Sequence, residues 1–171
     1  IASEDGRFFL LNSLSNRLCD PAVRESHKNE AAKNGLLMVV LLFIHMSKNP
    51  VVEQDMVPSA VLWSFLSHLG VSADSVGVFG LPSDLIAPSP SAEFVASGWL
   101  SFTRKKSNLE EGDSILYDWG PRAYTVLCPM KMLQTFCKIM DEDPEDWKEH
   151  YEKAKSTAHT SSEGNIDTID D

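Results

Sequence analysis

A run of nine consecutive apolar residues, Leu36 to Ile44, constrains the fold of this chain more than any other feature. As an α-helix, nine residues span only about 14 Å, roughly half of a bilayer's hydrocarbon core, so the run predicts a core helix and not a membrane span. The segment from Leu36 to Met46 is apolar on all sides, and a small domain can hardly cover such a helix unaided. We therefore expect part of it to meet another segment or a partner.

The formal charge of −10 is concentrated near one end of the sequence. Residues 141–171 hold 11 of the 25 acidic residues and 3 of the 15 Lys and Arg residues, which leaves 14 acids and 12 bases, a net charge of −2, for residues 1–140. An acidic stretch with few large apolar residues cannot offset the entropy of ordering. We predict a disordered acidic tail over residues 156–171, and the charge disfavours tight nucleic-acid binding by the whole chain.

The residues before the apolar run divide into two predicted segments. Arg7 to Asn12 is typical of a strand with nothing before it to pair with, and residue 1 is Ile, so residues 1–14 are interpreted as the remnant of a preceding domain. Residues 15–34 are polar and contain Asp20-Pro21, which is typical of a linker. The compact domain is expected over residues 35–155.

Within that domain the predicted order of elements is helix, helix, helix, hairpin, followed by two more helices. The second helix opens near Pro58 and is capped by Gly70, and an irregular connection over residues 71–92 follows it. The other expected elements are a helix at Glu93–Leu100, strands at Leu100–Lys106 and Ser114–Trp119, and helices at Pro129–Met140 and Glu145–Lys155. This order is that of a winged helix, in an α+β fold that is mainly α.

Several sequence blocks occur in a specific order within residues 35–155. They are Gly35-Leu-Leu-Met-Val-Val-Leu41, Phe79-Gly-Leu-Pro82, Trp119-Gly-Pro-Arg-Ala123, Met130-Lys-Met-Leu133 and Asp143-Pro-Glu-Asp-Trp147. Together they resemble the MAGE (melanoma-associated antigen) homology domain, in particular its second winged helix. The resemblance implies a tandem pair of winged helices whose first member, represented by residues 1–14, is largely missing. The ending at Trp147 is most similar to the non-SMC element three members, which are subunits of the five/six-type structural-maintenance-of-chromosomes (SMC) complex.

The resemblance implies a non-catalytic adaptor with no cofactor. Domains of this family bind RING-type ubiquitin ligases, and the chromosome-complex members contact a RING-containing subunit and a helix of a kleisin subunit. These members are also linked to DNA binding, which implies a role in DNA repair in the nucleus, with the cytoplasm as a second location. Cys19, Cys128 and Cys137 lack the spacing of metal ligands, so no metal site is expected.

The candidate partner-binding residues lie on two apolar helices and in the turn after the hairpin. We expect the helices at Leu36–Met46 and Pro129–Met140 to wall a groove for a partner helix. The candidates are Leu36, Leu37, Val40, Leu133, Phe136 and Arg122. For each of them ordinary packing is the alternative, and for Arg122 the favoured alternative is a rigid turn in which the arginine holds backbone carbonyls while Trp119 fills the core.

Arg104, Lys105 and Lys106 form the densest basic run and are the candidate DNA-binding residues. Three cations beside a groove can contribute sequence-independent, salt-sensitive affinity for duplex DNA. The alternative is a charged strand edge that prevents sheet aggregation. Sequence-specific recognition of DNA is not expected. Residues 91–103, which include the third predicted helix, contain no Arg, Asn or Gln that could bind base edges.

Overall fold

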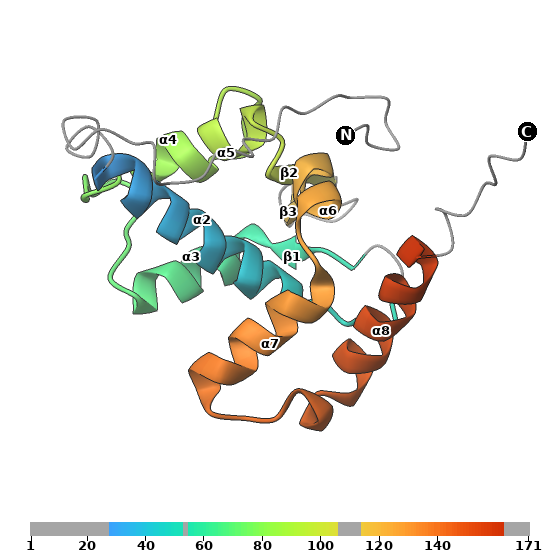
Figure 1. Cartoon of the computed structure of the whole chain (residues 1–171). Coiled ribbons are helices and arrows are strands. Elements are labelled where there is room, and N and C mark those ends of the chain that lie inside the picture. The colour runs from blue at the N-terminus through green and yellow to red at the C-terminus, as the bar shows by residue number, and fades with distance from the viewer. Residues whose placement is uncertain (1–27, 53–54, 106–113, 163–171) are drawn as a thin grey trace, which may run out of the picture.

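The computed structural model describes residues 28–52, 55–105 and 114–162 (Figure 1), with side chains described from residue 30 to residue 157. Its elements are α2 (Lys28–Ser47), β1 (Val57–Pro58), α3 (Ser59–His68), α4 (Pro82–Ile86), α5 (Glu93–Ala96), β2 (Leu100–Lys105), β3 (Ser114–Trp119), α6 (Pro121–Val126), α7 (Pro129–Met140), the 3₁₀ turn η2 (Pro144–Asp146) and α8 (Lys148–Ser162). The described part of the chain is mainly helical with one small antiparallel sheet, which confirms the predicted α+β class.

The sheet has the order β1-β3-β2, so β3 is its central strand. In the β2–β3 hairpin Leu100 lies opposite Trp119, and Lys105 lies opposite Ser114. Tyr117 at the middle of β3 is fully buried, and its hydroxyl donates a hydrogen bond of 2.6 Å to the carbonyl oxygen of Ile86. Burial raises the pKa of this phenol to about 12. The hydroxyl therefore stays protonated and ties the sheet to the end of α4.

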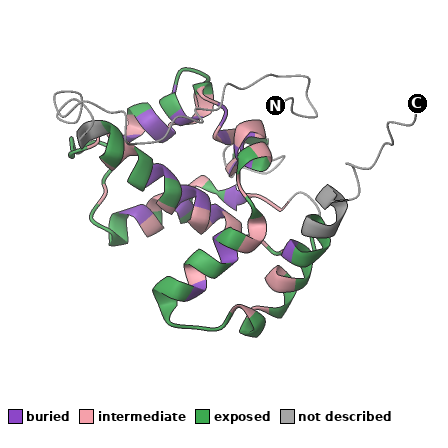
Figure 2. Cartoon of the chain, viewed as in Figure 1, coloured by how far each residue is buried: buried purple, intermediate pink, exposed green. Residues whose placement is uncertain are grey.

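The core is organised around α2, which runs from one edge of the molecule into its middle (Figure 1) and carries buried residues among exposed ones (Figure 2). These residues recur at three- and four-residue spacing and are Leu36, Leu37, Val40, Leu41 and Ile44. Trp119 is 4% exposed, and its indole Nε1 donates to the Leu41 carbonyl oxygen over 2.8 Å. The prediction that Trp119 fills the core is confirmed.

The residues Glu30–Ser47 of α2 have the length and mean hydropathy, 1.3, of a membrane-spanning helix. The same residues supply a large part of the core, where Val40, Leu41 and Ile44 are fully buried. Of this 18-residue window 28% is buried, and the buried residues form one face that packs in the core, while Met38 is 42% exposed. The prediction of a core helix is confirmed for this face, and the other side of the helix is not fully covered by the described residues.

Two predicted boundaries are wrong at the ends of the domain. Helix α2 begins at Lys28, inside the segment 15–34 that was predicted to be a linker, because Ala31 and Ala32 favour helix and Glu30 is favourable in a first turn. Helix α8 continues to Ser162, so the disorder predicted from residue 156 is wrong as far as residue 162. The predicted remnant at residues 1–14, Lys106 and the hairpin tip lie outside the described residues.

Two short helices were not predicted, and one predicted helix is shorter than expected. Helices α4 and α6 each begin with a proline at the first helical position, and such proline-rich stretches were interpreted as irregular chain or a turn. The third predicted helix, α5, ends at Ala96 instead of Leu100, because Gly98 has a positive φ of 76° and Leu100 already belongs to β2.

Candidate partner-binding site

A cavity of about 840 Å³ lies where the end of α2, helix α6, the start of α7 and helix α8 meet. Its volume is in the range of ligand-binding clefts. Residues from all of these elements line it, among them His45, Lys48, Tyr124, Leu127, His150 and Ala154. On its α6 side Tyr124 is 56% exposed and Val126 is 39% exposed. The cavity therefore has an accessible rim that carries aromatic and aliphatic side chains.

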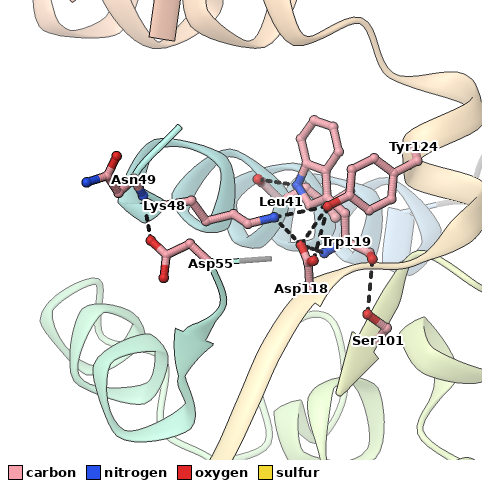
Figure 3. A network of polar contacts seen from close by, with 8 residues as sticks. All are labelled: Leu41, Lys48, Asn49, Asp55, Ser101, Asp118, Trp119 and Tyr124. Atoms are coloured by element: carbon pink, nitrogen blue, oxygen red, sulfur yellow. Dashed lines mark hydrogen bonds and ion pairs between the residues drawn. The ribbon is translucent and has the colours of Figure 1, made fainter. Parts of the chain in front are cut away.

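A polar network forms one wall of this cavity (Figure 3). The Lys48 ammonium forms an ion pair with Asp118 and donates to the Tyr124 hydroxyl over 3.0 Å. That hydroxyl in turn donates to the Asp118 carboxylate over 3.0 Å. Burial acts to lower the pKa of Lys48, but the hydrogen bonds to Asp118 and Tyr124 outweigh it and the pKa is raised. Lys48 is therefore charged, and it joins α2, β3 and α6.

His45 lies against the cavity with its ring stacked on Trp119, 5.0 Å between ring centroids, and edge-on to His150, 6.0 Å away. Burial lowers its pKa to about 4, repulsion from His150 and Lys48 adds to this effect, and a hydrogen bond with the backbone of Pro129 opposes it. The ring is therefore neutral near pH 7. In the described part of the chain, the Nε2 atoms of both histidines are buried without a hydrogen-bond partner.

Helix α8 forms the outer wall of the cavity and is held mainly through α7 and η2. Phe136 of α7 packs edge-to-face on Trp147 with 5.0 Å between centroids, and the Trp147 indole donates to the Glu142 carboxylate over 2.8 Å. Phe136, one of the predicted partner-binding residues, is half-buried in this contact. Phe136 therefore helps to position α8 through its contact with Trp147.

The structure corrects four of the predicted partner-binding residues. Leu36 and Leu37 are 7% and 5% exposed, and Val40 and Leu133 are fully buried. Helices α2 and α7 pack directly on each other, so their apolar stripes fill the space that was predicted to be a groove. These four side chains belong to the core and present little or no surface to a partner in this structure.

Arg122 lies at a tight crossing between the start of α6 and the start of the hairpin. Its backbone N–H donates to the Gly98 carbonyl oxygen over 3.0 Å, and a Cβ added to Gly120 would collide with the backbone of Gly98. The guanidinium lies 4.6 Å from the centre of the Trp99 ring, and its Nε is buried without a hydrogen-bond partner among the described residues. The arginine side chain thus stabilises the crossing by cation–π stacking, and the hydrogen bond to the carbonyl comes from its backbone.

Neither the cavity nor the set of residues that line it was predicted from the sequence. Lys48 and Asp118 are 70 positions apart in the sequence, and no local pattern signals that they form a pair. His45 has the sequence signature of an ordinary packing histidine, and α6, which supplies Tyr124, was not predicted. The one available signal was the position of Tyr124 immediately after the Trp119–Ala123 block.

Arg104 and Lys105 of the hairpin do not line this cavity. Arg104 and Lys105 are exposed at the end of β2, and Lys106 lies outside the described residues. The Arg104 guanidinium donates to the Pro88 carbonyl oxygen over 3.3 Å. Within the described residues the ion pairs involve Lys33 and Lys48, and no group of three or more His, Cys, Asp or Glu side chains could hold a metal ion.

Comparison with known proteins places this arrangement in one family. The family model of the MAGE homology domain matches residues 2–125. The chain is 31% identical over 147 residues, 84% of its length, to the non-structural maintenance of chromosomes element 3 homolog of Mus musculus, and 33% identical over 120 residues, 68% of its length, to the Homo sapiens homolog. A chain of a solved Nse1-Nse3-Nse4 complex superimposes with a TM-score of 0.63 at 23% identity.

The chain spans less than half the length of either curated relative. The sequence matches span 47% of the mouse protein and 35% of the human protein. The structural superposition covers 85% of this chain and 62% of the chain in the solved complex. The family-model match over residues 2–125 includes the sequence blocks as far as Ala123, whereas the blocks at Met130–Leu133 and Asp143–Trp147 lie beyond it. The chain belongs to the MAGE homology domain family.

Proposed function

We propose that this chain is part of an adaptor subunit of a nuclear chromosome-maintenance complex, and that it binds a RING-type ubiquitin ligase subunit and a helix of a kleisin subunit. The observation that carries the proposal is the sequence similarity to two element 3 homologs at 31% and 33% identity. The mainly helical fold, with a hairpin that we interpret as the wing of a winged helix, is compatible with it. The adaptor holds its partners by surface complementarity.

We assign the kleisin helix to the cavity between α6 and α8. An amphipathic helix binds through apolar residues at helical spacing, and it requires an apolar cleft with a few fixed polar groups. The cavity supplies Val126 and Leu127 as apolar contacts. It also supplies the polar groups of Tyr124 and Lys48, which the network with Asp118 holds in position. This assignment replaces the groove between α2 and α7, which the core fills.

Val126→Glu tests this assignment. A carboxylate on the α6 rim would face the apolar side of the partner helix, and the affinity for a kleisin helix should fall at least about tenfold, which corresponds to about 1.4 kcal/mol. The measurement is isothermal titration calorimetry of the full-length protein with a kleisin peptide. The control is Ile139→Glu, which places the same charge on the exposed outer face of α7 and should leave binding unchanged.

Equal affinities of the two variants would remove the cavity as the binding site. Failure of the unsubstituted full-length protein to bind either a kleisin peptide or a RING subunit would overturn the adaptor function itself.

The second candidate function is non-sequence-specific DNA binding by the wing. Arg104 and Lys105 are adjacent and exposed at the open end of β2, and this observation favours it. Exchange of Arg104, Lys105 and Lys106 for Glu should weaken duplex DNA binding and flatten its salt dependence, with a change in slope of roughly one for each phosphate that the protein no longer neutralises. Fluorescence anisotropy at two salt concentrations measures both quantities.

Lys138→Glu on α7 is the control, because this exposed lysine lies outside the hairpin. If the triple variant and this control bind DNA with the same affinity and the same salt slope, the wing takes no part in binding.

A further inference from the structure

The segment 87–91, Ala-Pro-Ser-Pro-Ser, connects α4 to α5 and carries the one Ser/Thr-Pro dipeptide in the sequence, Ser89-Pro90. Both ends of the segment are fixed, because Ile86 is fully buried and Ala92 is 3% exposed. Between them Ser89 is half-buried, and Pro90 and Ser91 are exposed. The dipeptide is thus presented on the surface by two buried anchors.

Among the residues that the structure describes, the hydroxyl of Ser89 makes only local hydrogen bonds. Its Oγ lies 2.8 Å from the Ser91 Oγ and accepts a 3.3 Å hydrogen bond from the Ser91 backbone N–H. Both contacts are exposed and join residues two positions apart. A change at this oxygen therefore disturbs the connecting segment and leaves the core contacts of Ile86 and Ala92 in place.

The positively charged side chain of Arg104 lies beside segment 87–91. The Arg104 guanidinium reaches across from β2 and donates to the carbonyl oxygen of Pro88, which belongs to the peptide group that joins Pro88 to Ser89. Arg104 makes no ion pair with another described residue. The nearby acid at the start of α5, Glu93, is already bound by Lys33 over 2.8 Å. Arg104 is therefore available to a new anion at Ser89.

We propose that Ser89 is a phosphorylation site for a proline-directed protein kinase, and that Arg104 binds the phosphate. In the reaction the Ser89 Oγ forms a bond to the γ-phosphorus of ATP, the bond from that phosphorus to the β,γ-bridging oxygen breaks, and ADP leaves. The hydroxyl proton passes to the catalytic base of the kinase. Proline after the serine has no N–H, which is the property that a proline-directed kinase selects.

The product places about −1.5 to −2 charges and three acceptor oxygens next to a guanidinium, whose planar donors bind phosphate in a bidentate manner. The phosphate holds Arg104 against segment 87–91 and connects that segment to β2. The same contact withdraws one cation from the exposed surface of the hairpin. This proposal does not depend on the partner binding proposed above.

The first test uses the full-length protein, a purified cyclin-dependent kinase and labelled ATP, with the modified residue located by mass spectrometry. We expect phosphate on Ser89 in the unsubstituted protein and none at this position in Ser89→Ala. Pro90→Ala, which keeps the serine, should also lose the modification, whereas Ser91→Ala should keep it. Circular dichroism verifies that each variant is folded. No phosphate on Ser89, or equal labelling of Pro90→Ala, would overturn the proposal.

The second test isolates Arg104. A ³¹P NMR titration of the phosphorylated protein reports the second ionisation of the phosphoserine, whose ordinary pKa is about 6. A bound guanidinium favours the dianion, so this pKa should lie lower in the unsubstituted protein than in Arg104→Ala, and Lys105→Ala should behave as the unsubstituted protein does. If the pKa is the same with and without Arg104, the assignment of Arg104 as the phosphate-binding residue is wrong.

Discussion

Leu133→Ala is expected to lower the free energy of unfolding by about 2–5 kcal/mol, because it removes a fully buried side chain of α7. Denaturation with urea, followed by circular dichroism, measures the change. The matched control is Ile139→Ala on the same helix, which is 68% exposed and should change the stability by no more than about 0.5 kcal/mol.

This experiment also separates the two roles that the sequence allows for Leu133. A core residue loses stability on truncation, whereas a partner-facing residue loses binding with little change in unfolding. If Leu133→Ala unfolds at the same urea concentration as the unsubstituted protein and binds its partner more weakly, then Leu133 is not buried in the core as described.

Protonation of His45 is expected to lower the free energy of unfolding by up to about 3 kcal/mol as the pH falls from 6.5 to 4. The pKa of this ring falls from an ordinary 6.5 to about 4 in the folded chain, mainly because it is buried. The unfolded state therefore binds the proton more tightly. The stability contributed by the neutral ring is complete above pH 6.5 and is lost as the pH falls toward 4, at about 1.4 kcal/mol for each pH unit.

The measurement is a series of urea unfolding curves from pH 7 to pH 4 for the unsubstituted protein, for His45→Phe and for His68→Gln. His45→Phe keeps an aromatic ring against Trp119 and removes the titrating group, so its stability should decrease much less over this range. His68 is exposed on α3, and His68→Gln should follow the unsubstituted protein. Parallel profiles for all three proteins would show that His45 is not the group responsible.

Those parts of the fold that depend on local periodicity could be predicted from the sequence. Helix α7 has the predicted bounds, Pro129 to Met140, because its apolar stripe and its initial proline are both local signals. The strand Ser114–Trp119 was also predicted, since the polar residues before it and Gly120 after it mark its ends. The core position of Trp119 followed from its place at the end of a strand.

What could not be predicted depends on contacts between distant segments. A buried stripe has the same appearance in the sequence whether it faces the core or a partner, so Leu36 and Leu133 were candidates for both. The cavity exists because α8 returns to the end of α2, where His150 meets His45. Helix α6 has six residues, too few for a periodic signal, and it supplies the Tyr124 that completes the network with Lys48.

Hydrogen–deuterium exchange of the full-length protein, with and without its RING and kleisin subunits, tests most directly whether the partner-facing surface is the α6–α8 cavity. We predict new protection in residues 121–129 and 148–157 on complex formation, and unchanged protection around Leu133, which is already buried in the free protein. Protection that rises around Leu36 and Leu133 while the cavity residues remain unchanged would contradict this assignment.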